Sequence, residues 1–215
     1  MNILVLAPHP DDEAIGCGGA VLNHVDRRDR VVTVFLTSGE LGLKTLPPAA
    51  AREVREAEAL AAAAILGTAS TLFLRLQDWG IGDDVDAAAA AIRPILGEER
   101  PAVIYLPHPE DDHPDHRACL PALRGAMRSI AVPAPDLRGY EVWTPMPAWE
   151  RAEDVTSVMP RKLAAVGAYR SQLEQFRYDR AVSGLNQYRG ALAGRCEFAE
   201  VFVHLGPDEP GLTGH

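Results

Sequence analysis

The chain has 215 residues, of which 47% are hydrophobic and 24% are charged, as in ordinary globular proteins with a substantial core. Its formal net charge of −9 argues against nucleic-acid binding, because a phosphate-binding surface needs clustered positive charge. No apolar stretch approaches the length of a membrane span, and Cys17, Cys119 and Cys196 have no paired spacing. We therefore expect one domain over residues 1–215 in a reducing cytoplasm, with a frayed tail at 206–215. The oligomeric state is left open.

Four short apolar runs are typical of strands that are buried on both faces. They cover residues 3–7, 31–36, 71–74 and 102–106, and they are mostly continuous rather than alternating. The first run is too short for a signal peptide and has no basic leader, so we interpret it as the first strand.

Helical stretches separate these runs at residues 16–27, 49–66, 84–96 and 115–129. Gly67 is a suitable stop for the second, while Pro94 and Pro121 are expected to bend or shorten the third and fourth. Further along, we expect one strand within the proline-rich region 131–147, a helix at 160–173 and a last strand at 198–205. Strand and helix alternate, which predicts a Rossmann-like three-layer α/β/α sandwich with a mostly parallel central sheet.

Two histidine-containing acidic clusters follow the first and fourth apolar runs. Their sequences are PHPDDE at residues 8–13 and HPDH at residues 113–116. Doubly wound sheets bind ligands beyond the carboxyl ends of their strands, where the strand order reverses. If the first and fourth strands flank that point, the two clusters meet there.

Neutral imidazoles beside carboxylates are the ligands that a catalytic Zn²⁺ prefers: two histidines, one carboxylate and an open position. His9 and Asp12 are three residues apart and can converge on one ion, which leaves Asp11 free. One histidine of the second cluster would complete the set. The remaining carboxylate and histidine are the two groups that hydrolysis needs, a base and a donor for the developing oxyanion.

The glycine-rich residues 16–19, GCGG, invite a dinucleotide-binding interpretation, but Val21 occupies the place of the last glycine in that pattern. We expect these glycines to let the first helix pack closely on the sheet, with Cys17 as a buried core residue. A nucleotide-binding module whose acidic loops hold Mg²⁺ or no metal is the alternative from another class of function. His24, on a predicted surface helix, is expected to be exposed.

The two clusters resemble the motifs of the PIG-L/LmbE-like family of zinc-dependent de-N-acetylases. Weaker patterns extend this resemblance over most of the chain: REAE at 55–58, Asp78, SQ at 171–172 and AEVF at 199–202. The resemblance implies a hydrolase that removes the N-acetyl group from an N-acetylglucosamine-type amino sugar or glycoconjugate. A zinc amidase that acts on a larger acyl or thiol conjugate is the alternative within metal-dependent hydrolysis.

By this resemblance, the zinc ligands would be His9, Asp12 and His116, and Fe²⁺ could replace zinc in a cell. The partner would be a small amino-sugar substrate, with Arg55 and Asp78 in contact with the sugar.

The resemblance also assigns the catalytic groups. Asp11 would be the general base, and a protonated His113 would stabilise the oxyanion, with Asp115 holding the His113 ring. Tyr169 departs from the family pattern His-x-Ser-Gln, and its role, like that of Trp79, is left open.

Overall fold

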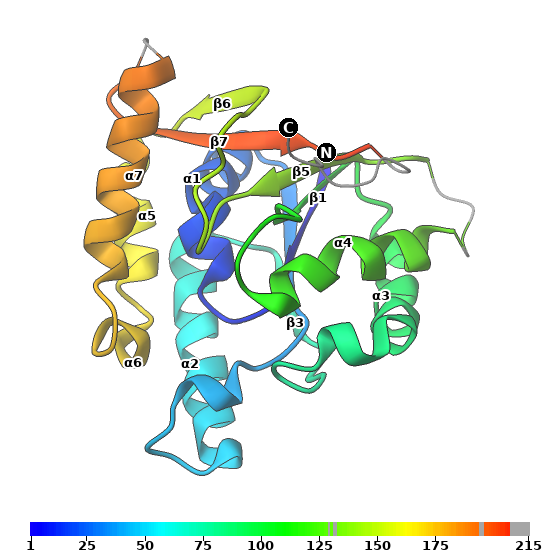
Figure 1. The fold of residues 1–215 in the computed structure, drawn as a ribbon. Helices are drawn as coiled ribbons and strands as arrows, with labels where there is room; N and C mark the ends of the chain where they lie inside the picture. The colour runs from blue at the N-terminus through cyan, green and yellow to red at the C-terminus, as the bar shows by residue number, and fades with distance from the viewer. Residues whose placement is uncertain (129, 131–132, 194–195, 207–215) are drawn as a thin grey trace.

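The computed structural model describes residues 1–128, 130, 133–193 and 196–206, and it has one mixed sheet between two layers of helices (Figure 1). The strands are β1 (Asn2–Ala7), β2 (Arg30–Phe35), β3 (Ser70–Phe73), β4 (Val103–Pro107), β5 (Asp136–Tyr140), β6 (Arg151–Asp154) and β7 (Ala199–His204). The helices are α1 (Asp12–Asp26), α2 (Pro48–Leu66), α3 (Val85–Glu99), α4 (Pro114–Met127), α5 (Met159–Val166), α6 (Arg170–Leu173) and α7 (Tyr178–Ala193). Short 3₁₀ turns lie at Glu40–Gly42 and Ile81–Asp84. This architecture confirms the predicted α/β class.

The strands are apolar at successive positions because helices cover both faces of the sheet. In β1, the side chains of Ile3 and Val5 pack into a core that contains residues of α1, α2 and α5. Leu4 and Leu6 point to the opposite face, where the core contains residues of α3 and α4. Figure 1 shows these two helical layers on either side of the strands.

The strand order is β3-β2-β1-β4-β5-β7-β6, and β1 is the strand where the order reverses. It pairs in parallel with β2 on one side and with β4 on the other. The carboxyl ends of β1 and β4 therefore lie side by side, as predicted, and they bring the two histidine clusters to one edge of the sheet. β7 runs antiparallel to β5, and β6 runs antiparallel to β7.

The observed helices differ from the predicted ones mainly at their ends. α1 begins at Asp12 rather than at residue 16, so Asp12 lies in its first turn. α4 continues through Pro121, because Leu120 and Leu123 beside it are buried in the core. Burial of each leucine stabilises by about 1.5–3 kcal/mol, which offsets the cost of about 3 kcal/mol for an internal proline. α3 likewise continues through Pro94.

The region after β5 contains elements that were not predicted. The expected helix at 160–173 divides into α5 and α6, and α7 and β6 had no counterpart in the prediction. The predicted ends that fall at residues 129 and 131–132, and the tail from 207, lie outside the described residues. None of the described helices combines the length and apolar character that a membrane span requires.

The glycines of α1 allow close packing, as expected. A Cβ atom at Gly16 would overlap the ring of Tyr140 on β5, and one at Gly19 would overlap Val155. These glycines lie inside α1 and not in the loop after β1, so the dinucleotide-binding interpretation is wrong. Cys17 is fully buried between them, as a core residue.

A buried ion pair stabilises the middle of α1. The backbone at Cys17 is not helical (φ −140°, ψ 17°), which frees amide groups one turn into the helix. The Glu200 carboxylate accepts hydrogen bonds from the backbone N–H groups of Gly19 (2.7 Å) and Ala20 (2.8 Å). Lys162 Nζ lies 2.6 Å from Glu200 Oε1 and compensates its charge. The AEVF pattern therefore supplies an internal cap for α1.

We expect Gly16→Ala to lower the free energy of unfolding by about 1–3 kcal/mol, because the added methyl group must displace the buried Tyr140 ring. Chemical denaturation measures this change. Gly97→Ala is the matched control: it is an exposed position in α3 with no atom near a new Cβ, and it should stabilise by up to about 1 kcal/mol. Equal destabilisation by both substitutions would contradict the packing argument.

Candidate metal centre

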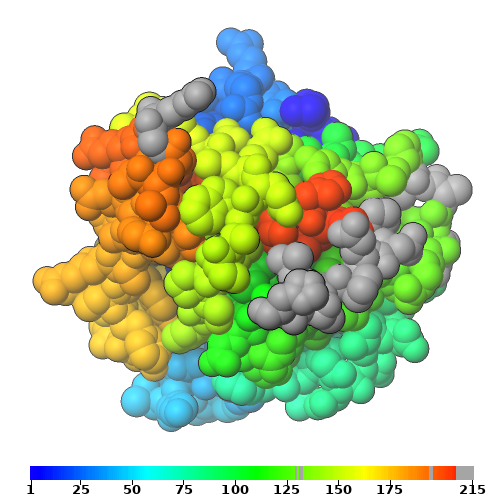
Figure 2. Space-filling view, turned by 45° about the horizontal axis from the view of Figure 1, so that its top comes forward, coloured from blue at the N-terminus to red at the C-terminus, as the bar shows by residue number. Residues whose placement is uncertain are grey.

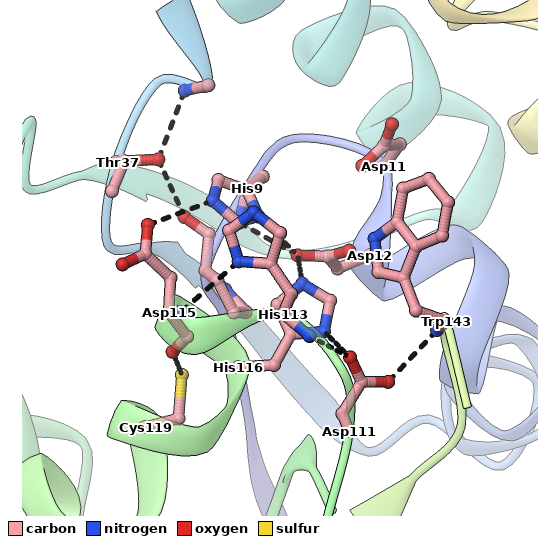
Figure 3. Close-up of polar contacts among 12 residues, drawn as sticks. His9, Asp11, Asp12, Thr37, Asp111, His113, Asp115, His116, Cys119 and Trp143 are labelled. Carbon is pink, nitrogen blue, oxygen red and sulfur yellow. Dashed lines mark hydrogen bonds and ion pairs between the residues drawn. The ribbon is translucent and has the colours of Figure 1, made fainter. Parts of the chain in front are cut away.

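The two clusters converge between the ends of β1 and β4 (Figure 3). His9 lies in the turn after β1, and Asp12 lies in the first turn of α1. His113 is the residue that caps the N-terminus of α4, and His116 lies in the first turn of the same helix. Both acidic clusters therefore sit at helix N-termini, and the sheet places those termini face to face.

A single carboxylate oxygen joins the two clusters. Asp12 Oδ2 lies 3.2 Å from His9 Nδ1 and 3.2 Å from His116 Nε2, and it accepts a hydrogen bond from the His9 backbone N–H at 2.9 Å. Burial alone would raise the pKa of Asp12, but the imidazoles of His116 and His9 outweigh it and lower the pKa. All three predicted metal ligands thus meet at one point.

His116 has the arrangement expected of a metal-binding histidine. Its Nδ1 lies 3.0 Å from Asp111 Oδ1, so a carboxylate behind the ring would hold the Nδ1 proton and leave the Nε2 lone pair facing Asp12. The ring is fully buried, and its Nε2 has no hydrogen-bond partner among the described residues, although Asp12 Oδ2 lies 3.2 Å away. Such a buried, unsatisfied nitrogen fits a metal ligand.

His9 shows the same arrangement, with the roles of its two ring nitrogens exchanged. Its Nε2 lies 3.2 Å from both Asp78 Oδ1 and Asp115 Oδ2, which leaves Nδ1 to face Asp12. Burial alone would lower the pKa of His9, but the carboxylates of Asp115, Asp12 and Asp78 raise it well above its usual value. The carboxylates around these rings therefore favour a positive charge at this point, as a divalent cation would provide.

His113 is placed differently, although its ring lies beside the other two. His9, His113 and His116 have ring nitrogens within 4.8 Å of one another. However, the backbone N–H of Asp115 donates to His113 Nδ1 at 3.2 Å, so the proton of the neutral ring is on Nε2. In this tautomer Nε2 carries the proton and is a hydrogen-bond donor, although His113 also belongs to the three histidines that could hold an ion.

The surroundings of His113 disfavour the protonated form that was expected, through its pKa. Burial lowers the pKa of His113 to about 4, and the neighbouring imidazoles of His9 and His116 act in the same direction. The position at the N-terminus of α4 also disfavours a positive charge. The neutral ring still carries the Nε2–H donor that an oxyanion requires.

The contact that Asp115 makes with the His113 ring comes from its backbone N–H, and its carboxylate is engaged elsewhere. The fully buried carboxylate contacts His9 Nε2 and accepts hydrogen bonds from the backbone N–H groups of Trp79 (2.8 Å) and Ile81 (3.1 Å). It therefore positions one predicted ligand and the loop after β3 together.

Asp11 directly precedes Asp12, and Figure 3 shows its carboxylate apart from the imidazole rings. Its backbone has φ 115°, a strained conformation for a residue with a side chain and one that is concentrated at functional sites. Arg55 Nη1 lies 3.6 Å from Asp11 Oδ2. Burial raises the pKa of Asp11 to about 7, although the Arg55 guanidinium opposes the rise. A carboxylate with such a pKa is suited to move protons near neutral pH.

A cavity of about 260 Å³ opens over these groups. Arg55 and Asp78, the predicted sugar contacts, both line it and are almost fully buried. Arg55 donates from Nη2 to Pro10 O at 2.5 Å, while its Nε and Nη1 have no hydrogen-bond partner among the described residues. Trp79, 58% exposed, stands at the rim with its ring centroid 4.4 Å from that of His113.

Asp111 and Glu13 support the site but were given no role in the sequence analysis, and the role of Tyr169 was left open there. Asp111 backs the His116 ring, and Glu13 accepts hydrogen bonds from the backbone N–H of Asp11 (3.1 Å) and the hydroxyl of Tyr169 (2.6 Å). Burial raises the pKa of Glu13 to about 8. The signal for Asp111 was its place just before the HPDH cluster, and the signal for Tyr169 was its departure from the family pattern.

A family model described as PIG-L, GlcNAc-PI de-N-acetylase, matches residues 4–127, more than half of the chain. The chain belongs to this family. A Bacillus cereus protein named probable N-acetyl-alpha-D-glucosaminyl L-malate deacetylase 2 is 30% identical over 190 residues, which cover 80% of this chain and 84% of the relative. The family assignment confirms that the chain is a deacetylase-type hydrolase of amide bonds.

Solved structures confirm the PIG-L fold. The N,N'-diacetylchitobiose deacetylase of Pyrococcus horikoshii superposes with a TM-score of 0.83 at 22% identity, covering 96% of this chain and 84% of that one. The 4-carboxy-2-hydroxymuconate hydratase of Pseudomonas putida superposes with a TM-score of 0.81 at 22% identity, covering 99% of both chains. Since a hydratase shares this fold, the reaction must be argued from the site.

We expect Asp111→Asn to weaken metal binding by about 10–100-fold, because the carboxylate that orients His116 is lost. Metal titration of the stripped protein measures the affinity. The neighbouring, exposed Asp112 provides the control Asp112→Asn, which should bind metal normally. Equal affinities of the two variants would show that Asp111 does not position a ligand.

We expect Tyr169→Phe to lower the free energy of unfolding by about 1–3 kcal/mol, because Glu13 would lose a buried hydrogen-bond donor. Denaturant unfolding measures the loss, with the exposed position Tyr188→Phe as a control that should stay within about 0.5 kcal/mol of wild type. Wild-type stability of Tyr169→Phe would rule out a structural contribution of this contact.

Proposed function

We propose that this protein removes the N-acetyl group from an N-acetylglucosamine-type amino sugar or its glycoconjugate, as one deacetylase domain over residues 1–215 that uses Zn²⁺. The observation that carries the proposal is the meeting of His9 Nδ1 and His116 Nε2 at Asp12 Oδ2, in the wall of a cavity that Asp11 also lines. Two imidazoles and one carboxylate are a donor set of a catalytic zinc site. The names of the Bacillus and Pyrococcus relatives, both acetamido-sugar deacetylases, support the choice of substrate.

His9, Asp12 and His116 would hold the metal, and Asp78, Asp115 and Asp111 would keep the two imidazoles in the binding tautomer. When bound, Zn²⁺ supplies a Lewis acid that polarises the amide carbonyl and makes water more acidic. Fe²⁺ could take the same place in a cell, because metal availability contributes to selection.

The remaining groups act on the substrate. Asp11 accepts a proton from the attacking water and returns it to the leaving amine, because its pKa lies near neutrality. The Nε2–H of His113 donates to the oxyanion that forms on the carbonyl oxygen. Arg55, with two unsatisfied donor nitrogens, and Asp78 bind sugar hydroxyl groups at the wall of the cavity.

The kind of partner and the cellular setting are inferred from the charge and the cysteines of the chain. The substrate is a small molecule, and the acidic chain has no features of nucleic-acid binding. Cys17, Cys119 and Cys196 are free thiols, which supports a reducing, cytoplasmic setting.

The test is to quantify bound metals in the purified protein and to assay amine release from N-acetylglucosamine and its glycosides, with and without a chelator. About one zinc per chain and chelator-sensitive amine release are expected. Zinc without amine release from any acetamido sugar would contradict the substrate, and no transition metal after reloading would contradict the ligand set.

Two substitutions separate the base from the ligands. Asp11→Asn should retain metal but lose turnover by about 10²–10⁴-fold, and Asn tolerates a positive φ better than most residues. His116→Ala should lose both metal and turnover. The exposed His204 gives the control His204→Ala, which should retain both. Near-native turnover of Asp11→Asn would remove Asp11 from the base role, and full metal content of His116→Ala would remove His116 from the ligands.

A further inference from the structure

A second cavity, of about 430 Å³, lies next to the cavity over the metal centre, and we call it the side chamber. Its walls come from α1, the segment after β5, α7 and β7. Figure 2 shows α7 in orange beside the yellow-green segment that follows β5. The two cavities share the lining residues Ile15, Val142, Trp143, Phe176 and Tyr178. The side chamber therefore adjoins the catalytic cavity.

Much of the side-chamber wall is hydrocarbon. Ala181, Val182 and Leu185 of α7 line it together with Ile15 of α1 and Pro145. A cavity of this size and lining is typical of small-molecule sites, whose volumes are about 300–1,000 Å³.

The charged residues in its wall, Glu141, Arg177 and Glu200, are already engaged, and Arg177 pairs with Asp179. The Glu141 carboxylate pairs with Arg189 and accepts a hydrogen bond from the Met146 backbone N–H. The Glu200 carboxylate binds Lys162 and caps α1. A polar ligand group would lose its hydrogen bonds to water and find no free partner among these charged residues. The chamber therefore favours an apolar group.

Three aromatic rings stand where the two cavities meet. Trp143 and Phe176 are 46% and 50% exposed, and with Tyr178 they form a cluster whose ring centroids lie 5.6–5.9 Å apart. Large exposed apolar side chains gathered at one place mark a binding surface rather than a solvated one. Here they line the passage between metal centre and chamber.

This aromatic cluster is fixed to the metal centre by a hydrogen bond. The Trp143 backbone N–H donates to Asp111 Oδ2 at 2.9 Å, and Asp111 Oδ1 faces His116 Nδ1 (Figure 3). The same carboxylate thus positions a predicted metal ligand and the aromatic cluster, which makes the chamber a continuation of the catalytic site.

We propose that the side chamber binds an alkyl or aryl substituent of the amino-sugar substrate, so that the preferred substrate is larger and more apolar than N-acetylglucosamine. The inference rests on the proposed function. Such a substituent can be attached at the glycosidic oxygen or can extend the acyl group, and either one presents the same chemistry to the chamber.

The experiment compares kcat/KM for two series with the metal-loaded protein. One series is N-acetylglucosamine with methyl, butyl, hexyl and phenyl groups on the glycosidic oxygen, and the other is methyl glucosaminide with acetyl, butyryl and hexanoyl groups on nitrogen. In one series, kcat/KM should rise by about fourfold for each methylene group that the chamber buries. The series that shows the rise identifies where the substituent is attached.

Variants then test whether the chamber causes the rise. Ala181→Trp places an indole in the chamber from an exposed position of α7, and it should reduce the ratio of long-chain to compact kcat/KM towards one. Leu185→Gln should reduce the same ratio without filling the chamber. Ala191→Trp, at an exposed position of α7 outside the chamber, should keep the wild-type ratio.

No rise in either series, or a rise that Ala181→Trp and Leu185→Gln both retain, would overturn the inference while hydrolysis of the compact substrate upholds the proposed function. No amine release from any member of either series would overturn both.

Discussion

The site depends on one carboxylate oxygen, Asp12 Oδ2. It brings together the backbone and imidazole of His9 and the imidazole of His116, two residues more than 100 positions apart in the sequence. Only the parallel pairing of β1 with β4 makes this contact possible, because it places the N-termini of α1 and α4 at the same edge of the sheet. Helix N-termini favour negative charge, which lowers the cost of burying the Asp12 carboxylate. A cation bound beside it would compensate the remaining buried charge.

Asp111 and Asp115 extend this constraint outward. Each carboxylate contacts one imidazole and also holds the backbone of a loop that forms the cavity wall: Asp115 holds the loop of Trp79, and Asp111 holds the loop of Trp143. The orientation of the metal ligands and the shape of the substrate cavity are therefore set by the same two buried groups. A hydratase superposes on this fold, so the fold alone does not decide the substrate, and the loops around the site carry specificity.

The sequence predicted the first four strands because continuous apolar runs mark strands buried on both faces. It predicted the convergence of the histidine clusters because the switch-point rule places ligand sites where the strand order reverses. It did not predict β6, whose sequence RAED has no apolar pattern and which pairs with β7 through its backbone. It placed His24 on the surface, whereas His24 is buried and contacts Asp29 (2.7 Å) and Tyr105 (3.1 Å) through its two ring nitrogens. Such pairings depend on distant residues that spacing does not encode.

The departure at Tyr169 shows how a different side chain can serve this site. The buried carboxyl group of Glu13 accepts two hydrogen bonds, one from the Tyr169 hydroxyl and one from the backbone N–H of Asp11. The backbone of Asp11 is strained, so the second of these bonds helps to hold its conformation. Burial raises the pKa of the Tyr169 hydroxyl well above its usual value, and Glu13 adds to the rise, so the hydroxyl keeps its proton near neutral pH and donates to Glu13. A phenol provides this hydrogen bond without adding a charge next to Asp11. The orientation of the proposed base therefore depends on a hydrogen bond to Glu13, and not on a histidine at position 169.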